Sequence, residues 1–202
     1  MARLLLIPAL FVAAALTSSS VAQTGGATQR AIFAGGCFWS AEHDMEEVPG
    51  VISAVSGFTG GSVPNPSYEQ TTTGRTGHVE AVVVVFDPAR ISYGQLVRRF
   101  LHTIDPTDDG GQFCDRGPNY RTAIFAIGER QRREALAAVA EANRQLGGRV
   151  VTPVRAASRF YGAETYHQDY ARRNPGHYNR YRQGCGKDAR LREIWGAQAA
   201  TH

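Results

Sequence analysis

The sequence predicts a single α+β domain, in which a mixed, partly antiparallel sheet is flanked by helices and followed by a long irregular C-terminal tail. Three observations indicate this class. Segments typical of strands and of helices alternate unevenly along the chain, which favours a mixed sheet. The 202 residues are 43% hydrophobic, which is enough for one domain with a substantial core. No internal repeat is visible, and the last part of the chain has no clear period.

The predicted helices are recognised by apolar residues at helical spacing, and the predicted strands by runs rich in β-branched residues. In the first helix, Phe38, Ala41 and Met45 recur at that spacing, and the Pro49-Gly50 pair ends the helix. In chain order, we expect a strand at 30–34, a helix at 38–48, strands at 51–57 and 78–86, a helix capped by Ser92 that runs to 102, a strand at 120–127, a helix at 129–146, a short strand at 152–156 and a brief helix at 164–173.

The segment 1–22 has the parts of a secretory signal peptide. Arg3 supplies a positive start, residues 4–16 are almost wholly apolar, and small residues follow. We therefore expect cleavage before Gln23, a domain over 23–202, and an exported protein that is periplasmic or secreted. A retained membrane anchor is disfavoured because the apolar segment is shorter than the roughly 20 residues that span a bilayer, so we expect no membrane insertion of the mature chain.

The charge and the cysteines exclude several classes. The formal net charge is +4 at pH 7, and the arginines are scattered, which indicates solvated helix faces rather than a nucleic-acid surface. Cys37, Cys114 and Cys185 are widely separated, and no Cys-x-x-Cys motif is present. An odd count leaves at least one thiol outside any intramolecular bridge. This pattern disfavours zinc and favours a catalytic thiol over a disulfide framework, so we expect no metal and no cofactor.

A thiol stands where a predicted strand turns into a predicted helix. Gly35 and Gly36 follow the first strand, and Cys37 precedes the aromatic pair Phe38-Trp39. Unpaired N–H groups and the helix dipole at a helix N-terminus favour an anion, so the thiol there should ionise more easily and become nucleophilic. The alternative is a small, inert, buried cysteine behind a glycine turn.

Glu80 lies near the start of a strand that is apolar on both faces. The run 78–86 is therefore predicted to be central and buried. Burial favours the neutral form of a carboxyl group and raises its pKa, and a carboxylic acid kept protonated near neutral pH can act as a general acid. The alternative is a glutamate paired with an arginine. His78-Val79-Glu80 also matches half of a zinc deaminase signature, whose Pro-Cys-x-x-Cys half is absent.

Two other functional classes remain open at this point. A cysteine hydrolase would need a base for Cys37, and the candidates are His78, His102 and His167, none of which the spacing identifies. The chain instead offers an acid, Glu80. The second class is a secreted binding domain without activity.

Several separate blocks of sequence resemble those of one enzyme family. They cover most of residues 30–175, in the family's order and spacing. The blocks are Gly36-Cys37-Phe38-Trp39, Gly57-Phe58-Thr59-Gly60-Gly61, Asn65-Pro66-Ser67-Tyr68, Gly74-Arg75-Thr76-Gly77-His78-Val79-Glu80, Asp105-Pro106-Thr107, Asp115-Arg116-Gly117-Pro118-Asn119-Tyr120-Arg121 and Tyr166-His167-Gln168-Asp169-Tyr170. On these motifs the chain resembles the A-type peptide methionine sulfoxide reductases.

The resemblance implies a reaction. A cysteine thiolate attacks the sulfur of methionine S-sulfoxide, free or in oxidised proteins, and becomes a sulfenic acid as methionine departs. A second cysteine condenses with the sulfenic acid to form an intramolecular disulfide, which a thioredoxin-like reductant restores to thiols. The implied protein is an oxidoreductase that repairs oxidative damage, and we expect a monomer with no nucleic-acid partner.

The resemblance also implies which residues act. Cys37 would be the nucleophile, Glu80 the proton donor and Cys185 the resolving cysteine. The substrate-binding roles fall on two tyrosines that hydrogen-bond the sulfoxide oxygen, two aromatic residues that hold the methyl group and an acidic residue of the same pocket: Tyr68 and Tyr120, Phe38 and Trp39, and Asp115. A sulfoxide has a strong oxygen acceptor and an apolar methyl group, so hydroxyl donors and an aromatic wall suit it.

The chain departs from the family at its other two cysteines. Cys114 is not at a position on which the family generally relies, and it could take part in turnover, pair transiently or be inert. The tail has one cysteine, Cys185, whose flanking glycines give the segment the freedom to swing toward Cys37. The alternative is that Cys185 is merely buried.

Overall fold

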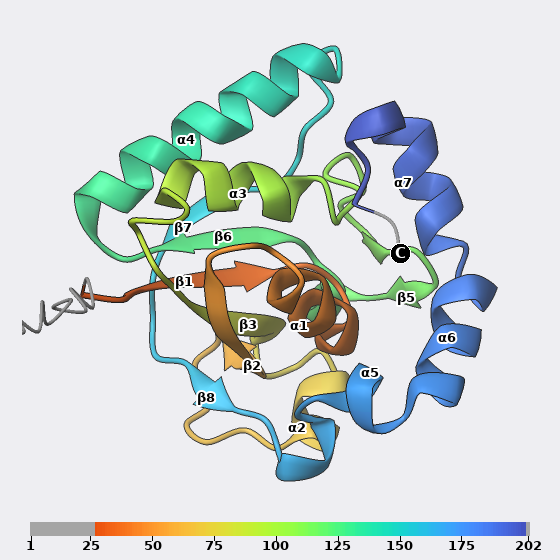
Figure 1. Cartoon of the computed structure of the whole chain (residues 1–202). Coiled ribbons are helices and arrows are strands. Elements are labelled where there is room, and N and C mark those ends of the chain that lie inside the picture. The colour runs from red at the N-terminus through yellow and green to blue at the C-terminus, as the bar shows by residue number, and fades with distance from the viewer. Residues whose placement is uncertain (1–26, 201–202) are drawn as a thin grey trace, which may run out of the picture.

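A six-stranded mixed sheet forms the centre of the computed structural model, which describes residues 27–200 (Figure 1). The strand order is β7-β6-β1-β3-β2-β8, and every neighbouring pair is antiparallel except β6 and β7. The predicted α+β class with a mixed, partly antiparallel sheet is therefore confirmed. The strands are β1 (Gln29–Ala34), β2 (Val51–Thr59), β3 (Val79–Phe86), β6 (Ala123–Ala126), β7 (Val154–Ala156) and β8 (Tyr161–Gly162), and a separate pair is formed by β4 (Gly111–Gln112) and β5 (Asp115–Arg116).

The strand predicted to be central is central. β3 pairs with β1 on one side and β2 on the other, and both of its faces are covered. Val82 and Val84 face the larger core, while Ala81 and Val83 face a smaller cluster on the opposite side of the sheet. Glu80 therefore lies on the same face of the sheet as Val82 and Val84, because alternate side chains of a strand point to opposite faces.

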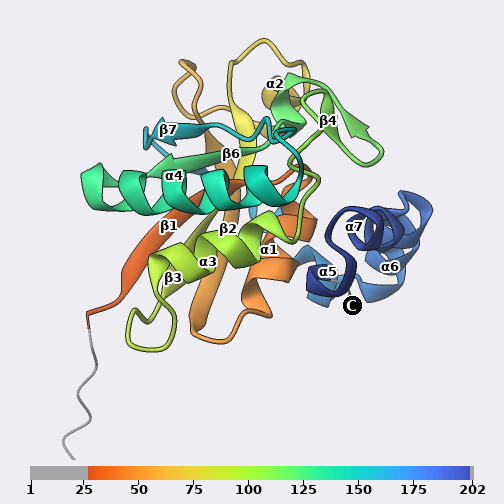
Figure 2. The same cartoon turned by 90° about the horizontal axis from the view of Figure 1, so that it is seen from above.

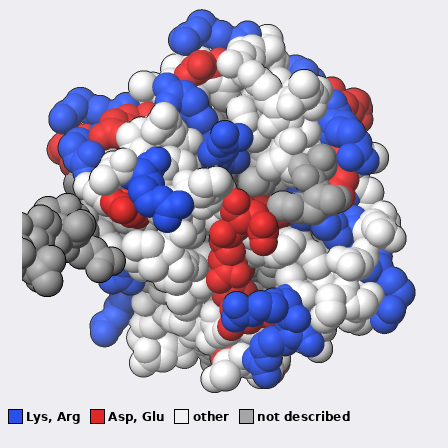
Figure 3. Space-filling view, in the orientation of Figure 1, with Lys and Arg blue, Asp and Glu red and all other residues white. Residues whose placement is uncertain are grey.

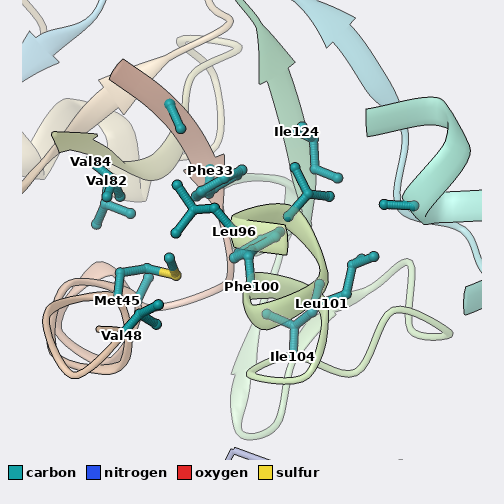
Figure 4. Packing of buried hydrophobic residues seen from close by; sticks show 14 of the residues in the cluster. Phe33, Met45, Val48, Val82, Val84, Leu96, Phe100, Leu101, Ile104 and Ile124 are labelled. Carbon is teal, nitrogen blue, oxygen red and sulfur yellow. The ribbon is translucent and has the colours of Figure 1, made fainter. Parts of the chain in front are cut away.

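Helices cover the larger core on one face of the sheet, where α3 and α4 lie side by side (Figure 2). Figure 4 shows this packing, in which the ring of Phe33 from β1 stacks on that of Phe100 from α3 at 4.5 Å between centroids. The helices are α1 (Phe38–Glu46), α2 (Tyr68–Thr72), α3 (Tyr93–Leu101), α4 (Gly128–Gln145), α5 (Tyr170–Arg173), α6 (Pro175–Gly184) and α7 (Lys187–Trp195), with 3₁₀ turns at Pro118–Tyr120, Thr165–His167 and Gly196–Gln198.

The start of α3 follows the predicted cap. The Ser92 hydroxyl accepts a hydrogen bond from the Gln95 N–H, and the Gln95 side chain accepts one from the Ser92 N–H. This capping box satisfies two of the N–H groups that a helix leaves unpaired at its start.

The expectation of an irregular C-terminal tail is wrong in detail, because the tail folds into α6 and α7. Pro175 begins α6, and Gly186, with a φ of 65°, makes the turn between the two helices. The stripe that these helices bury contains the charged residues Arg182 and Lys187. A search for apolar periodicity cannot recognise such a face. The brief helix expected at 164–173 is likewise divided into a 3₁₀ turn and α5.

No helix within residues 27–200 is long and apolar enough to cross a bilayer. The predicted signal peptide at 1–22 lies outside the described residues. Basic side chains are dispersed over the face of the molecule in Figure 3 instead of forming one continuous patch.

Candidate active site

Cys37 is delivered by the turn between β1 and α1, as predicted. Its carbonyl accepts the first hydrogen bonds of α1, from the N–H groups of Ser40 and Ala41. Gly36 has a φ of 81°, and a Cβ atom there would lie 2.5 Å from the Cβ of Gln112. Only glycine fits this approach without a rearrangement, so the glycine turn fixes the thiol at the N-terminus of α1.

Glu80 lies directly beneath this turn. Its side chain is 1% exposed, and its Oε2 accepts a hydrogen bond of 2.9 Å from the Phe38 N–H. Burial raises the pKa of Glu80 to about 8; the Phe38 N–H opposes this shift, and the nearby Asp115 adds to it. Among the described residues, Glu80 forms no ion pair with an arginine. The arrangement therefore fits the protonated acid rather than the alternative of a salt bridge.

The Cys37 thiol is less acidic here than its helix position predicts. Cys37 is a free thiol, and the residue is partly exposed although the sulfur itself is desolvated. Burial first, then the charges of Glu80 and Asp115, raise the pKa of Cys37 far above its usual value, while a Tyr181 hydroxyl and the Trp39 N–H oppose the shift. In this structure burial and two carboxyl groups outweigh the helix N-terminus, so the thiol is held protonated.

Two tyrosine hydroxyls meet beside the thiol and Glu80. Tyr68 opens α2, and its N–H donates to Glu164 Oε1 at 3.0 Å, whereas Tyr120 ends the 3₁₀ turn that follows β5. The Tyr120 hydroxyl is within hydrogen-bond reach of that of Tyr68, and burial followed by the charge of Glu80 raises the pKa of Tyr68 to about 12. Both phenols therefore remain protonated hydrogen-bond donors at neutral pH.

An aromatic wall adjoins these groups. The Phe38 ring lies 5.7 Å from Phe58 and 6.1 Å from Tyr68. The Trp39 indole stacks on Tyr170 at 3.7 Å with an interplanar angle of 7°. The structure thus brings the predicted nucleophile, acid, tyrosines, aromatic pair and acidic pocket residue to one place: Cys37, Glu80, Tyr68, Tyr120, Phe38, Trp39 and Asp115.

Sequence reasoning gave no role in sulfoxide reduction to three residues that belong to this site. The Trp39 Nε1–H donates to His167 Nδ1 at 3.0 Å, which together with the stacked Tyr170 fixes the plane of the indole. His167 and Tyr170 both lie in the block 166–170, and this motif was the sequence signal that could have identified them. Tyr181 contacts Cys37 and donates a hydrogen bond to Asp115, and its place in a polar helix left no signal in the sequence.

The histidines considered for a hydrolase are engaged elsewhere. His78 contacts the Val63 carbonyl and the Gly61 N–H through its two ring nitrogens, and His102 packs against Trp195. His167 bonds Trp39 as described. No group of histidine, cysteine, aspartate or glutamate residues within residues 27–200 is arranged to hold a metal ion.

The structure joins Cys114 to Cys185 in a disulfide and leaves Cys37 free. Pairing is one of the alternatives left open above for Cys114, whereas the resemblance implies a disulfide between Cys185 and Cys37. Cys185 is the C-cap of α6, and Cys114 lies between the short strands β4 and β5, next to Asp115. The predicted resolving cysteine is therefore bonded to the residue beside the substrate pocket, and its role remains a prediction.

Comparisons with known proteins agree with this geometry. Residues 29–199 match the family described as "PMSR: Peptide methionine sulfoxide reductase". "Peptide methionine sulfoxide reductase MsrA 2" of Caulobacter vibrioides is 49% identical over 189 residues, which is 91% of this chain and 93% of that protein. The structure is similar to methionine sulfoxide reductase A of Corynebacterium diphtheriae, with a TM-score of 0.70, 37% identity and coverage of 76% of this chain and 77% of that chain.

A second solved structure is reduced Mxr1 from Saccharomyces cerevisiae. Its TM-score is 0.70 at 28% identity, with coverage of 73% of this chain and 86% of that chain. The family match extends over almost all the described residues, and it includes every residue of the site. The chain therefore belongs to the peptide methionine sulfoxide reductase family.

Proposed function

We propose that this chain reduces methionine S-sulfoxide, free or in proteins, to methionine, and so repairs oxidative damage. The observation that carries the proposal is the meeting of a nucleophilic thiol, a protonated carboxylic acid and paired tyrosine hydroxyls at Cys37, Glu80, Tyr68 and Tyr120. A sulfoxide needs a sulfur nucleophile on one side and proton donors for its oxygen on the other.

The geometry suits a transfer of oxygen from one sulfur to another. The Cys37 thiolate attacks the sulfoxide sulfur, while Glu80 supplies a proton to the oxygen and the two tyrosines donate hydrogen bonds to it. The substrate's sulfur–oxygen bond breaks and a sulfur–oxygen bond forms on Cys37. Methionine leaves, reduced by two electrons, and Cys37 becomes a sulfenic acid.

Recycling then involves the other two cysteines. Attack of the Cys185 thiolate on the Cys37 sulfenic acid releases water and forms a Cys37–Cys185 disulfide. Attack of Cys114 on the Cys185 sulfur frees the Cys37 thiol and forms the Cys114–Cys185 disulfide. Support comes from the Cys114–Cys185 bond itself and from the exposure of Cys114, which makes the final disulfide accessible to a thioredoxin-like dithiol. Mxr1, a protein of the same fold, has been solved in complex with Trx2.

The direct test is an assay with purified mature protein, dithiothreitol and a peptide that contains methionine S-sulfoxide. We expect methionine to form from the S epimer and not from the R epimer. A protein that instead cleaved esters or amides without forming methionine would be a hydrolase, and a protein inert in both assays would be a binding domain.

We expect the Cys185→Ser variant to release about one methionine per chain in a single turnover and then to stall with a thioredoxin-type reductant, because no disulfide is offered for exchange. Dithiothreitol should bypass the block by attacking the sulfenic acid. Peptide mapping should find Cys37 joined to Cys185 in the oxidised Cys114→Ser variant. If Cys185→Ser keeps full thioredoxin-driven turnover and maps as Cys37 joined to Cys114, then Cys114 is the resolving thiol.

We further propose that the protein is exported, to the periplasm or outside the cell, and acts there as a monomer that is not inserted in the membrane. The support is the signal-peptide pattern at 1–22. Mass spectrometry of the protein from its host should give a mature N-terminus at Gln23. A chain that begins at residue 1 or 2 and fractionates with the cytoplasm would contradict the proposal.

A further inference from the structure

Tyr181 of α6 lies inside the active site. Its hydroxyl donates a hydrogen bond to Asp115 Oδ2 and is within hydrogen-bond reach of the Cys37 thiol. Its ring meets the Trp39 indole edge-on, with 6.2 Å between centroids and an interplanar angle of 81°. Its three contacts are thus the nucleophile, one side of the aromatic wall and the acidic residue of the pocket. A methionine sulfoxide side chain would need the same space.

The Tyr181 hydroxyl is committed to Asp115. A phenol has one hydrogen to donate, and Tyr181 gives it to the Asp115 carboxylate. Burial, followed by the charges of Glu80 and Asp115, raises the pKa of Cys37, and the Tyr181 hydroxyl opposes this shift. The contact therefore fills the pocket beside a thiol that burial keeps protonated.

α6 is fastened over the site at two places. The first is covalent: Cys185, the C-cap of α6, is bonded to Cys114, the neighbour of Asp115. The second is ionic: Arg182 of α6 and Lys187, the first residue of α7, pair with Asp44 of α1 at 2.7 and 2.6 Å, and all three side chains are at most 5% exposed. Figure 1 shows α6 and α7 beside α1 and β5. The helix that carries Tyr181 is thus tied to both the nucleophile's helix and the pocket loop.

We propose that Tyr181 is an internal occupant of the substrate site, that the Cys114–Cys185 disulfide holds it there, and that reduction of this disulfide opens the site to the next methionine sulfoxide. This inference rests on the proposed function. The disulfide makes the competition of Tyr181 with substrate intramolecular, which raises its effective concentration in the pocket. Once the bond is reduced, α6 is held by the ionic contacts and by the buried Tyr178, which contacts Ser40 and His43 of α1, and substrate displaces the phenol.

Closure of the pocket would make reduction of the disulfide precede the next reduction of methionine sulfoxide. While the disulfide is present, no thiol remains to resolve a new sulfenic acid on Cys37, and such an acid is open to irreversible oxidation. A closed pocket prevents a second turnover until the reductant has acted. The access of substrate to the buried Cys37 thiol thus depends on whether the reductant has reduced the exposed disulfide.

The test uses the enzyme that carries the Cys114–Cys185 disulfide and a free Cys37 thiol, as verified by peptide mapping and thiol counting. This protein is mixed with excess methionine S-sulfoxide peptide and no reductant. We expect far less than one methionine per chain from the wild type, and about one per chain from Cys185→Ser and from disulfide-bonded Tyr181→Ala. Disulfide-bonded Arg180→Ala, altered at the exposed neighbour on α6, should behave as the wild type.

Alkylation of Cys37 by iodoacetamide, followed by mass spectrometry of the Cys37 peptide, tests the occupant without turnover. We expect disulfide-bonded Tyr181→Ala to react at least about tenfold faster than wild type, because exposure and thiolate content govern cysteine reactivity. Circular dichroism checks that the Tyr181→Ala variant is folded. The comparison of wild type with Cys185→Ser does not depend on that variant.

Two results would overturn the inference. One is a disulfide-bonded wild type that forms one methionine per chain as fast as Cys185→Ser. The other is a folded Tyr181→Ala variant that forms none while Cys185→Ser forms one. If no protein forms methionine, including Cys185→Ser, the proposed function fails, and the alkylation rates alone decide whether Tyr181 covers the thiol.

Discussion

We expect the Cys37→Ser variant to form no methionine from methionine S-sulfoxide, a loss of more than about 10⁴-fold, because the reacting nucleophile is absent. A serine hydroxyl is not ionised in this buried site, and its oxygen cannot accept oxygen from the substrate as a sulfenic acid. Serine is close to cysteine in size and keeps the glycine turn and the first hydrogen bonds of α1. The loss should therefore appear in the chemical step and not in folding.

The measurement is methionine formed with dithiothreitol as reductant, which does not require the other two cysteines. Cys114→Ser is the matched control, since it makes the same replacement at the exposed cysteine and should stay active under these conditions. Substantial methionine formation by Cys37→Ser would refute the assignment of the nucleophile.

The elements that the sequence predicts well are those whose cores are apolar. The valine run of β3 is buried on both faces, as its composition indicates, and α3 begins at the serine that its cap predicts. In these places local propensity, hydrophobic period and tertiary packing agree. The turn before Cys37 is equally predictable, because two consecutive glycines between a predicted strand and a predicted helix indicate a tight turn.

α6 and α7 escape prediction because their buried faces are polar. Arg182 is buried through ion pairs with Asp44, which lies 138 residues earlier in the chain. A charged residue is predicted to be solvent-exposed unless its partner is known. Pairing between residues so far apart in the sequence depends on the whole fold. The sequence does not predict the disulfide of Cys185 with Cys114 for the same reason.

The acidity of Cys37 shows the limit of a local argument. A helix N-terminus favours a thiolate, and the sequence predicts that position correctly. Burial, the first cause of the raised pKa of Cys37, depends on how the whole fold packs around the sulfur and not on the helix alone. The position of the thiol could thus be predicted, whereas the state in which the structure holds it could not.

We expect Glu80→Gln to slow sulfoxide reduction by about 10²- to 10⁴-fold, the usual contribution of a general acid. Glutamine keeps the size of the side chain and an oxygen that can accept the Phe38 N–H. Substrate affinity should therefore change less than the rate of the chemical step. The measurement is the single-turnover rate of methionine formation, since later disulfide exchange does not limit it.

The pH dependence identifies the acid. Burial raises the pKa of Glu80 to about 8, so the group is protonated below that pH and loses its proton as the pH rises through it. The ratio of the wild-type rate to the Glu80→Gln rate should be constant below pH 8 and fall about tenfold per pH unit above it. Taking the ratio removes the part of the Cys37 titration that the two proteins share. The charge that Glu80 gains above pH 8 raises the pKa of Cys37 in the wild type alone, which adds to the fall.

Glu42→Gln is the matched control, because Glu42 is also buried and burial raises its pKa to about 7. Its oxygens accept hydrogen bonds from the N–H groups of Ser56 and Asp169, away from the thiol, so its rate should stay within about threefold of wild type. If Glu80→Gln instead reduces sulfoxide at a near-normal rate at pH 7, the proton comes from another donor. The paired hydroxyls of Tyr68 and Tyr120 are then the remaining candidates within reach of the substrate oxygen.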